Sequence, residues 1–185
     1  MPTSEGLLRK AIQLEAEGDD KLALATLDEV LRVSPGSREA LLRAAWLSYE
    51  ADNDDDAVGY LSRMGGSDSL ANDTTKAKQT RLMAEGLTTL LAGNTDGALS
   101  KFDVALGFDP NDTDVLFHIA EVATDNGNFD KADAALGMCL KADAQNPFCG
   151  FQRIETLTYE GRYDQAINEY ARLIQAGSKY PWLRC

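Results

Sequence analysis

The sequence is poor in the residues that most often carry catalysis and metal binding. Among its 185 residues there are one histidine and three cysteines. Because Cys139, Cys149 and Cys185 show no C-x-x-C spacing, we expect neither a disulfide framework nor a cysteine zinc site. The lone His118 has no second imidazole to work with, which disfavours metal sites and catalytic triads. We therefore expect no catalytic residues, no cofactor and no metal.

Long apolar runs and an excess of positive charge are also missing. No segment approaches the roughly 18 consecutive apolar residues of a membrane-spanning helix, and the first residues lack the basic start of a signal peptide. Eighteen Lys and Arg stand against 30 Asp and Glu, which gives a formal net charge of −12. This charge repels nucleic-acid phosphates and anionic lipid surfaces. The sequence therefore predicts neither nucleic-acid binding nor membrane insertion.

What the sequence does contain is an internal repeat. Alanines that follow a polar turn recur at intervals of 34, 41, 34 and 34 residues: Ala23, Ala57, Ala98, Ala132 and Ala166. Mostly large apolar side chains stand four and seven residues after each alanine, a spacing that marks one face of a helix. Five residues before each alanine stands a residue that we expect to end the preceding helix: Gly18, Asp52, Gly93, Gly127 and Gly161. Each unit is therefore predicted to be two helices joined by a short turn.

Five such units follow one another, at about residues 4–36, 38–66, 79–111, 113–146 and 147–179. Residues 67–78 predict an insertion between the second and third units, either a loop or a lengthened helix start. One helix pair cannot bury its apolar face alone, so the units must stack. Aspartates two residues before four of the alanines predict caps for the second helices: Asp55, Asp96, Asp130 and Asp164.

A 34-residue helix-turn-helix unit of this kind resembles the tetratricopeptide repeat. The third unit is the nearest match, with Gly86, Gly93, Ala98, Phe102, Ala105 and Asp109-Pro-Asn. The fifth unit supplies Tyr159-Glu-Gly-Arg-Tyr-Asp-Gln-Ala166. The resemblance implies an all-α fold, a right-handed α-α superhelix (solenoid) formed by residues 1–185 as a single domain. It also implies a non-catalytic module for protein–protein interaction.

In this family the first helices of the repeats line a concave groove at positions i, i+3, i+7, i+10 and i+11. Carried over to this chain, the resemblance gives 25 positions, of which eight are acidic and none is basic. Because some of these side chains could instead pack between adjacent helices, a core role stays open for them. A peptide or helical segment that is basic and apolar or aromatic would fit such a groove. The residues that we expect to bind it are Leu8, Ile12, Leu42, Trp46, Tyr49, Met83, Leu87, Phe117, Glu121, Phe151, Glu155 and Tyr159.

The end of the sequence raises two alternatives. Pro181-Trp182 stands 34 residues after Pro147-Phe148, so residues 180–185 predict the truncated start of a sixth repeat. The chain then looks like an excised segment of a longer protein. It could be a structural spacer that self-associates through its terminal repeats, or the regulatory arm of a larger multidomain enzyme. We expect a cytoplasmic location, while a periplasmic or other location stays open because of the truncated appearance.

Overall fold

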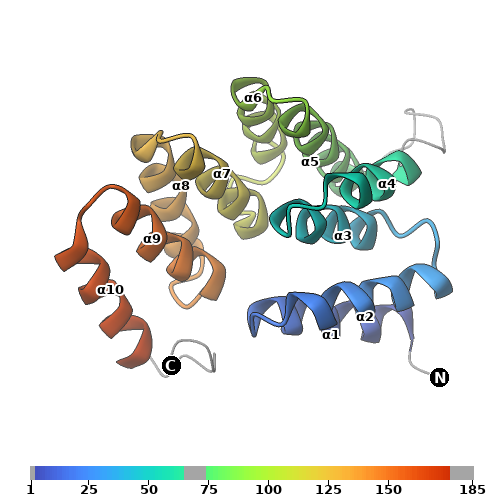
Figure 1. Ribbon diagram of the computed structural model, residues 1–185, viewed down its shortest axis with the longest axis horizontal. Coiled ribbons are helices and arrows are strands. Elements are labelled where there is room, and N and C mark those ends of the chain that lie inside the picture. Colours follow the sequence, from blue (N-terminus) through green and yellow to red (C-terminus); the bar gives the residue numbers. More distant parts are fainter. Residues whose placement is uncertain (1–2, 65–73, 176–185) are drawn as a thin grey trace. The chain divides into compact units, whose positions relative to one another are not determined.

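The computed structural model describes residues 3–64 and 74–175, and within these ranges all regular secondary structure is α-helical (Figure 1). The chain divides into two compact units, residues 1–94 and residues 95–185. The sixth repeat expected at 180–185 lies outside the described residues. Helices of the first unit are α1 (Ser4–Ala16), α2 (Asp20–Val33), α3 (Arg38–Glu50), α4 (Asp54–Met64) and α5 (Thr75–Leu91). Those of the second are α6 (Thr95–Leu106), α7 (Thr113–Asp125), α8 (Phe129–Ala142), α9 (Pro147–Tyr159) and α10 (Tyr163–Gln175).

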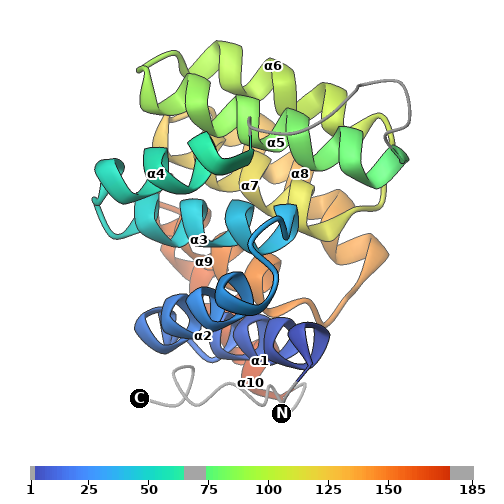
Figure 2. The same cartoon turned by 90° about the vertical axis from the view of Figure 1, so that its right-hand side faces the viewer.

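Each first helix ends in a left-handed residue, as the sequence predicted. The four turn glycines have φ between 70° and 80°, and Asp52 stands in the same place with φ 55°. The residue that follows donates its amide to a carbonyl five residues earlier, as Asn128 does to Ala123 at 2.8 Å. This bond closes the first helix and reverses the chain direction. The two helices of a repeat therefore pack as an antiparallel pair in α1 with α2, α3 with α4, α7 with α8 and α9 with α10 (Figure 2).

In α2, α4 and α8 the residue that caps the second helix is the last residue of the turn. Asn128 accepts a hydrogen bond from the Lys131 amide at 3.3 Å, and Asp19 and Asn53 cap α2 and α4 in the same way. The capping prediction is wrong for Asp55, Asp96, Asp130 and Asp164, which lie inside the first helical turns. An N-cap needs a non-helical backbone, so these carboxylates can only interact with the helix dipole.

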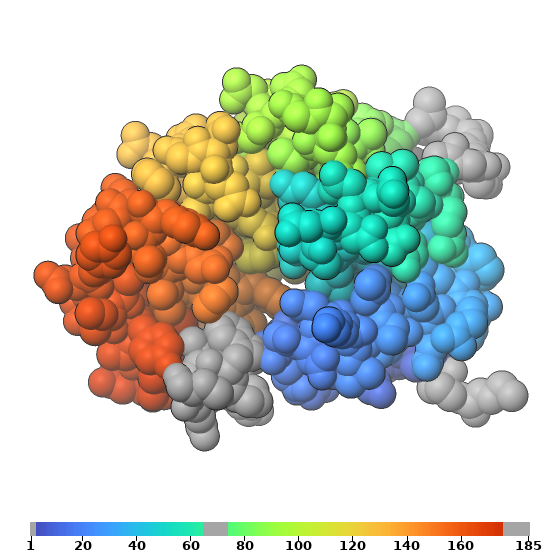
Figure 3. Space-filling view, viewed as in Figure 1, coloured from blue at the N-terminus to red at the C-terminus, as the bar shows by residue number. Residues whose placement is uncertain are grey.

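The repeating alanines lie in the core, as expected. Four of them are 0% exposed, and Ala166 is 6% exposed. The first helices contribute small residues as well, namely the buried Ala11, Ala45, Gly86 and Ala120. Small side chains let paired helices approach closely, and larger apolar residues fill the remaining space between them. In the space-filling view, the helices of residues 4–64 (blue to teal) lie against one another (Figure 3).

The longest described helix is α5, with 17 residues. It begins at Thr75, capped by the Thr74 hydroxyl, which accepts from the Ala77 amide at 3.2 Å. The end of the expected 67–78 insertion is therefore a lengthened helix start, whereas its residues 67–73 lie outside the described ranges. Within residues 3–64 and 74–175, no helix combines the length and the apolar character that crossing a membrane would require.

Cys139 and Cys149 form a disulfide between α8 and α9, although the spacing of the cysteines gave no reason to expect a disulfide framework. Their Cα atoms lie 6.4 Å apart, within the range of about 4.4–6.8 Å that the bond allows. Both residues are buried. The search for C-x-x-C spacing missed the pair because the two residues are ten positions apart and meet only after the chain turns between two helices.

The core position of Ala132 can be tested by overpacking it. We expect Ala132→Leu to lower the free energy of unfolding by about 1–3 kcal/mol, because Ala132 is 0% exposed and a larger side chain would overpack the core. Ala134→Leu is the matched control, since Ala134 is exposed on the same helix. Urea denaturation of both variants measures the difference, and equal midpoints would contradict the assigned helix phase.

Candidate functional site

Helices α7 and α9 are the first helices of two successive repeats, and they pack against each other within the second unit. Each presents side chains at intervals of three or four residues, so these side chains share one side of their helix. We call this surface the α7–α9 face. It consists of Phe117, Glu121 and Asp125 from α7, and Phe148, Phe151, Glu155 and Tyr159 from α9.

A buried pair of threonines joins the two helices beneath this face. The Thr124 and Thr156 hydroxyl oxygens lie 2.8 Å apart, and both residues are buried. Each hydroxyl also lies 2.8 Å from the carbonyl four residues earlier in its helix. Two protons cannot serve three contacts, so one hydroxyl donates to the other, which in turn donates to its own carbonyl. The bond fixes the register of α7 against α9.

Aromatic rings form the apolar part of the α7–α9 face. The centroids of the Phe117 and Phe148 rings are 5.6 Å apart, a tilted contact between the two helices. Phe151 is 38% exposed and Tyr159 is 68% exposed. Large rings left in contact with water are typical anchors of a protein interface, because covering them yields much free energy for little lost side-chain freedom.

Carboxylates form the charged part of the face. Burial raises the pKa of Glu155, and the nearby charge of Asp125 raises it further. Neither carboxylate forms an ion pair with a described residue. On α7, the Glu121 carboxylate lies 3.1 Å from the His118 Nδ1. Among the described residues, no cation therefore compensates the charge of Glu155 on this face.

The first unit differs, because its carboxylates already have a cation. Arg43 of α3 lies 2.7 Å from the Glu15 carboxylate of α1 and 3.8 Å from that of Glu39. The 25 expected groove positions do not include Arg43, which directly follows Leu42, so their charge count contained no cation. The Glu15 carboxylate of the first unit is therefore already compensated by a cation, whereas Glu155 of the second unit has no such partner among the described residues.

The expected groove residues fall into three groups. Phe151 and Tyr159 are exposed, whereas Leu8, Ile12, Leu42, Tyr49, Phe117, Glu121 and Glu155 are half-buried. Trp46, Met83 and Leu87 are buried, at 3%, 3% and 0% exposed, which fits the core role that the sequence left open for some of these positions. These apolar side chains gain more by leaving water than by lining a wet surface. Phe148 and Asp125, which the expected set omitted, belong to the α7–α9 face.

Comparison with protein families agrees with the helix pairs. Two family models, both described as tetratricopeptide repeat, match residues 8–69 and residues 89–147. The chain belongs to the tetratricopeptide repeat family. A search of curated proteins finds no matching sequence. The family assignment makes the chain a helical-repeat scaffold for protein–protein interaction, a type of fold that is generally non-catalytic.

Solved structures show the same fold. TTC0263, a thermophilic tetratricopeptide repeat protein in Thermus thermophilus, matches with a TM-score of 0.68 and 22% identity over 98% of this chain and 95% of that one. MamA matches with a TM-score of 0.53 and 17% identity, covering 91% of this chain and 95% of its own. YrrB, a tetratricopeptide repeat protein with an unusual peptide-binding site, gives 0.52 and 15%, covering 98% and 90%. The all-α helical-repeat architecture is therefore confirmed.

The raised pKa of Glu155 predicts a gain in stability when its charge is removed. Its pKa in the folded protein lies above the ordinary glutamate value of 4.5, so the ionised form weakens the fold at neutral pH. We expect Glu155→Gln to raise the melting temperature at pH 7. The gain should shrink as the pH falls through the raised pKa, and vanish below the ordinary glutamate pKa, where the carboxyl is protonated in both the folded and the unfolded state.

Glu169→Gln is the contrasting control for this measurement. The Glu169 carboxylate accepts a hydrogen bond from Arg172 at 2.6 Å, so its removal should cost about 0.2–1 kcal/mol at pH 7. Differential scanning calorimetry across pH 4–8 would compare the two variants. Equal effects of the same sign would show that burial does not strain Glu155.

Proposed function

We propose that the α7–α9 face binds a segment of a partner protein that carries both positive charge and apolar or aromatic side chains. The observation that supports this most is Glu155, a half-buried carboxylate with a raised pKa and no ion pair among the described residues. It lies on the same side of α9 as the exposed rings of Phe151 and Tyr159. A lysine or arginine from a ligand would supply the missing countercharge while its apolar neighbours cover the rings.

The two kinds of side chain have different parts in this binding. At about 0.15 M salt the Debye length is roughly 8 Å. The carboxylates therefore attract a basic ligand mainly during its approach to the face. They should therefore raise the association rate. The rings lose water contact only in the complex, so they should slow dissociation. The peptide-binding site described for YrrB supports a peptide as the class of ligand. The net charge of −12 argues against nucleic acid.

Selection from a random peptide library displayed on phage tests the proposal. We expect the wild-type chain to enrich peptides that combine Lys or Arg with Phe, Leu or Trp. Phe151→Ala should then weaken binding of the most enriched peptide by about 10-fold or more through faster dissociation. Glu155→Lys should slow association, most steeply at low salt, as surface plasmon resonance would show.

Matched controls separate the face from general effects. Met138→Ala removes an exposed apolar side chain on α8, and Glu29→Lys makes the same charge change on α2. Both variants should bind the enriched peptide like the wild type. Enrichment of acidic peptides, or equal losses in the control variants, would contradict the proposal.

Self-association is a second candidate, favoured by one surface of α10. Ile167 is 65% exposed, whereas the residue at the same repeat position in α6, Leu99, is 4% exposed. Tyr163 and Ile174 are exposed on α10 as well. A second copy of the chain could cover this apolar surface. Sedimentation velocity over a range of concentrations would show an oligomer that Ile167→Asp dissolves, and a concentration-independent monomer would contradict this candidate.

A further inference from the structure

Three junctions between successive repeats carry the same kind of buried residue pair. In each pair one residue lies near the end of a second helix, and its mate lies ten positions later in the following first helix. At two junctions the pair is apolar, and at the third it is the disulfide. The pairs are Val30 with Ala40, Ala105 with Val115, and Cys139 with Cys149.

Apolar burial alone is therefore sufficient to form such a junction. Val30 and Ala40 are both part of the hydrophobic core of the first unit. A reduced cysteine pair would serve equally well, because a buried thiol behaves as a small apolar side chain. Packing thus accounts for two small residues at this junction, and the covalent bond adds a constraint that the other two junctions lack.

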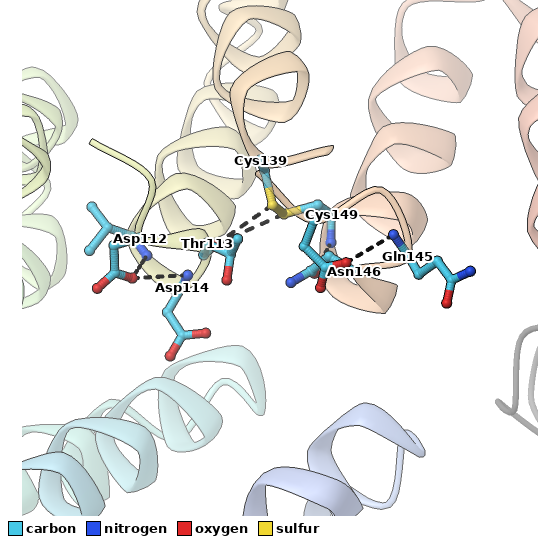
Figure 4. Close-up of a disulfide and its surroundings, with 9 residues drawn as sticks. Asp112, Thr113, Asp114, Cys139, Gln145, Asn146 and Cys149 are labelled. Atoms are coloured by element: carbon cyan, nitrogen blue, oxygen red, sulfur yellow. Dashed lines mark hydrogen bonds between the residues drawn. A yellow bond between two sulfur atoms is a disulfide. The ribbon is translucent and has the colours of Figure 1, made fainter. Parts of the chain in front are cut away.

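The disulfide holds the start of α9. Cys149 is the third residue of that helix, and its amide donates to the Asn146 side chain at 3.0 Å. Both sulfurs lie 3.9 Å from the carbonyl oxygen of Thr113, the first residue of α7 (Figure 4). Phe148, which contacts Phe117 across the α7–α9 face, directly precedes Cys149. The bond is therefore one residue away from the ring that links the two helices of the face.

We propose that the Cys139–Cys149 disulfide is a redox-controlled lock on the start of α9, which regulates ligand binding at the α7–α9 face by fixing Phe148. The regulatory part rests on the proposed function of that face. Locking removes two protons and two electrons from the thiols, and a disulfide oxidant takes them up and becomes a dithiol. A dithiol reductant reverses the exchange. The locked form would persist in an oxidising compartment and not in a reducing cytosol.

The unlocked form has its own partner for a thiol. In the disulfide neither sulfur carries a proton, so the contacts with the Thr113 oxygen are not hydrogen bonds. After reduction, either thiol could donate to that oxygen. Because both sulfurs are buried, a reductant reaches them only when the junction between α8 and α9 opens. Because two other junctions form with apolar pairs and no bond, we expect both redox states to fold and to differ mainly at this junction.

Peptide mapping tests whether the bond forms. In a Cys185→Ala variant treated with oxidised glutathione, trypsin without reductant should release residues 132–141 joined to residues 142–153. Cleavage after Lys141 separates the two cysteines, so only a disulfide keeps these peptides together. Recovery of both cysteines as alkylated thiols after this treatment would overturn the proposal.

Hydrogen exchange tests whether the bond acts as a lock. The double variant Cys139→Val, Cys149→Ala copies the Val30 and Ala40 pair and keeps an apolar junction without the bond. We expect the amides of residues 149–153 to exchange at least about tenfold more slowly in the oxidised wild type than after dithiothreitol treatment. In the double variant these amides should exchange as fast as in the reduced wild type, and dithiothreitol should not change their exchange rate. Equal exchange in the two redox states would overturn the lock.

Binding of the most enriched phage peptide separates this inference from the proposed function. Oxidised wild type should bind it about 3- to 10-fold more tightly than reduced wild type, mainly through slower dissociation. Equal binding in both states, together with a difference in exchange, would overturn the coupling between the lock and the face. Failure of the selection to enrich any peptide would overturn the proposed function, while the exchange measurement would still decide whether the disulfide locks α9.

Discussion

Close approach of paired helices at a small residue is the contact on which the rest of the structure depends. Ala132 and its repeat equivalents sit where one helix crosses another, and a larger side chain there would force the helices apart. Each pair then has one further apolar side that only the next repeat can cover. Stacking aligns successive first helices, which is how α7 and α9 come to share an exposed face.

Features that depend on local sequence and its period could be predicted, and features that depend on the fit between neighbours could not. Gly127 and its equivalents end their helices because a left-handed backbone is needed at one point of the turn. The same turn places Asn128 directly before α8, with the non-helical backbone that an N-cap needs. The backbone conformation of the turn therefore favours Asn128 over Asp130 as the cap. By contrast, helix phase alone could not reveal that Trp46 and Leu87 are buried. Their positions border both the groove and the neighbouring helix, and only the packing of that helix determines whether the side chains are buried or exposed.

Ion pairs between helices also depend on the fit between neighbours and could not be predicted from the groove positions alone. The expected groove positions are acidic and without cations, yet Arg43 pairs with Glu15 from a position just outside the set. A side chain as long as arginine reaches across to the next helix, so a charge count restricted to one face is incomplete. The carboxylate of Glu155 lacks such a neighbour among the described residues, and burial raises its pKa instead. The proposed binding of a cationic segment would account for negative charge kept at a cost to the stability of the fold.

Comparison with the equivalent positions of other repeats shows what the disulfide adds to its junction. Taken alone, two cysteines ten residues apart indicate little, but Val30 with Ala40 and Ala105 with Val115 occupy the same two positions at other junctions. The stability of a repeat array is approximately a sum of repeat and nearest-neighbour interface contributions. A covalent bond at one junction therefore stabilises that interface and has little effect on the stability of distant repeats. Because Phe148 lies at this interface, a change in the redox state of the two sulfurs would act locally on the α7–α9 face and leave the remaining helix pairs folded.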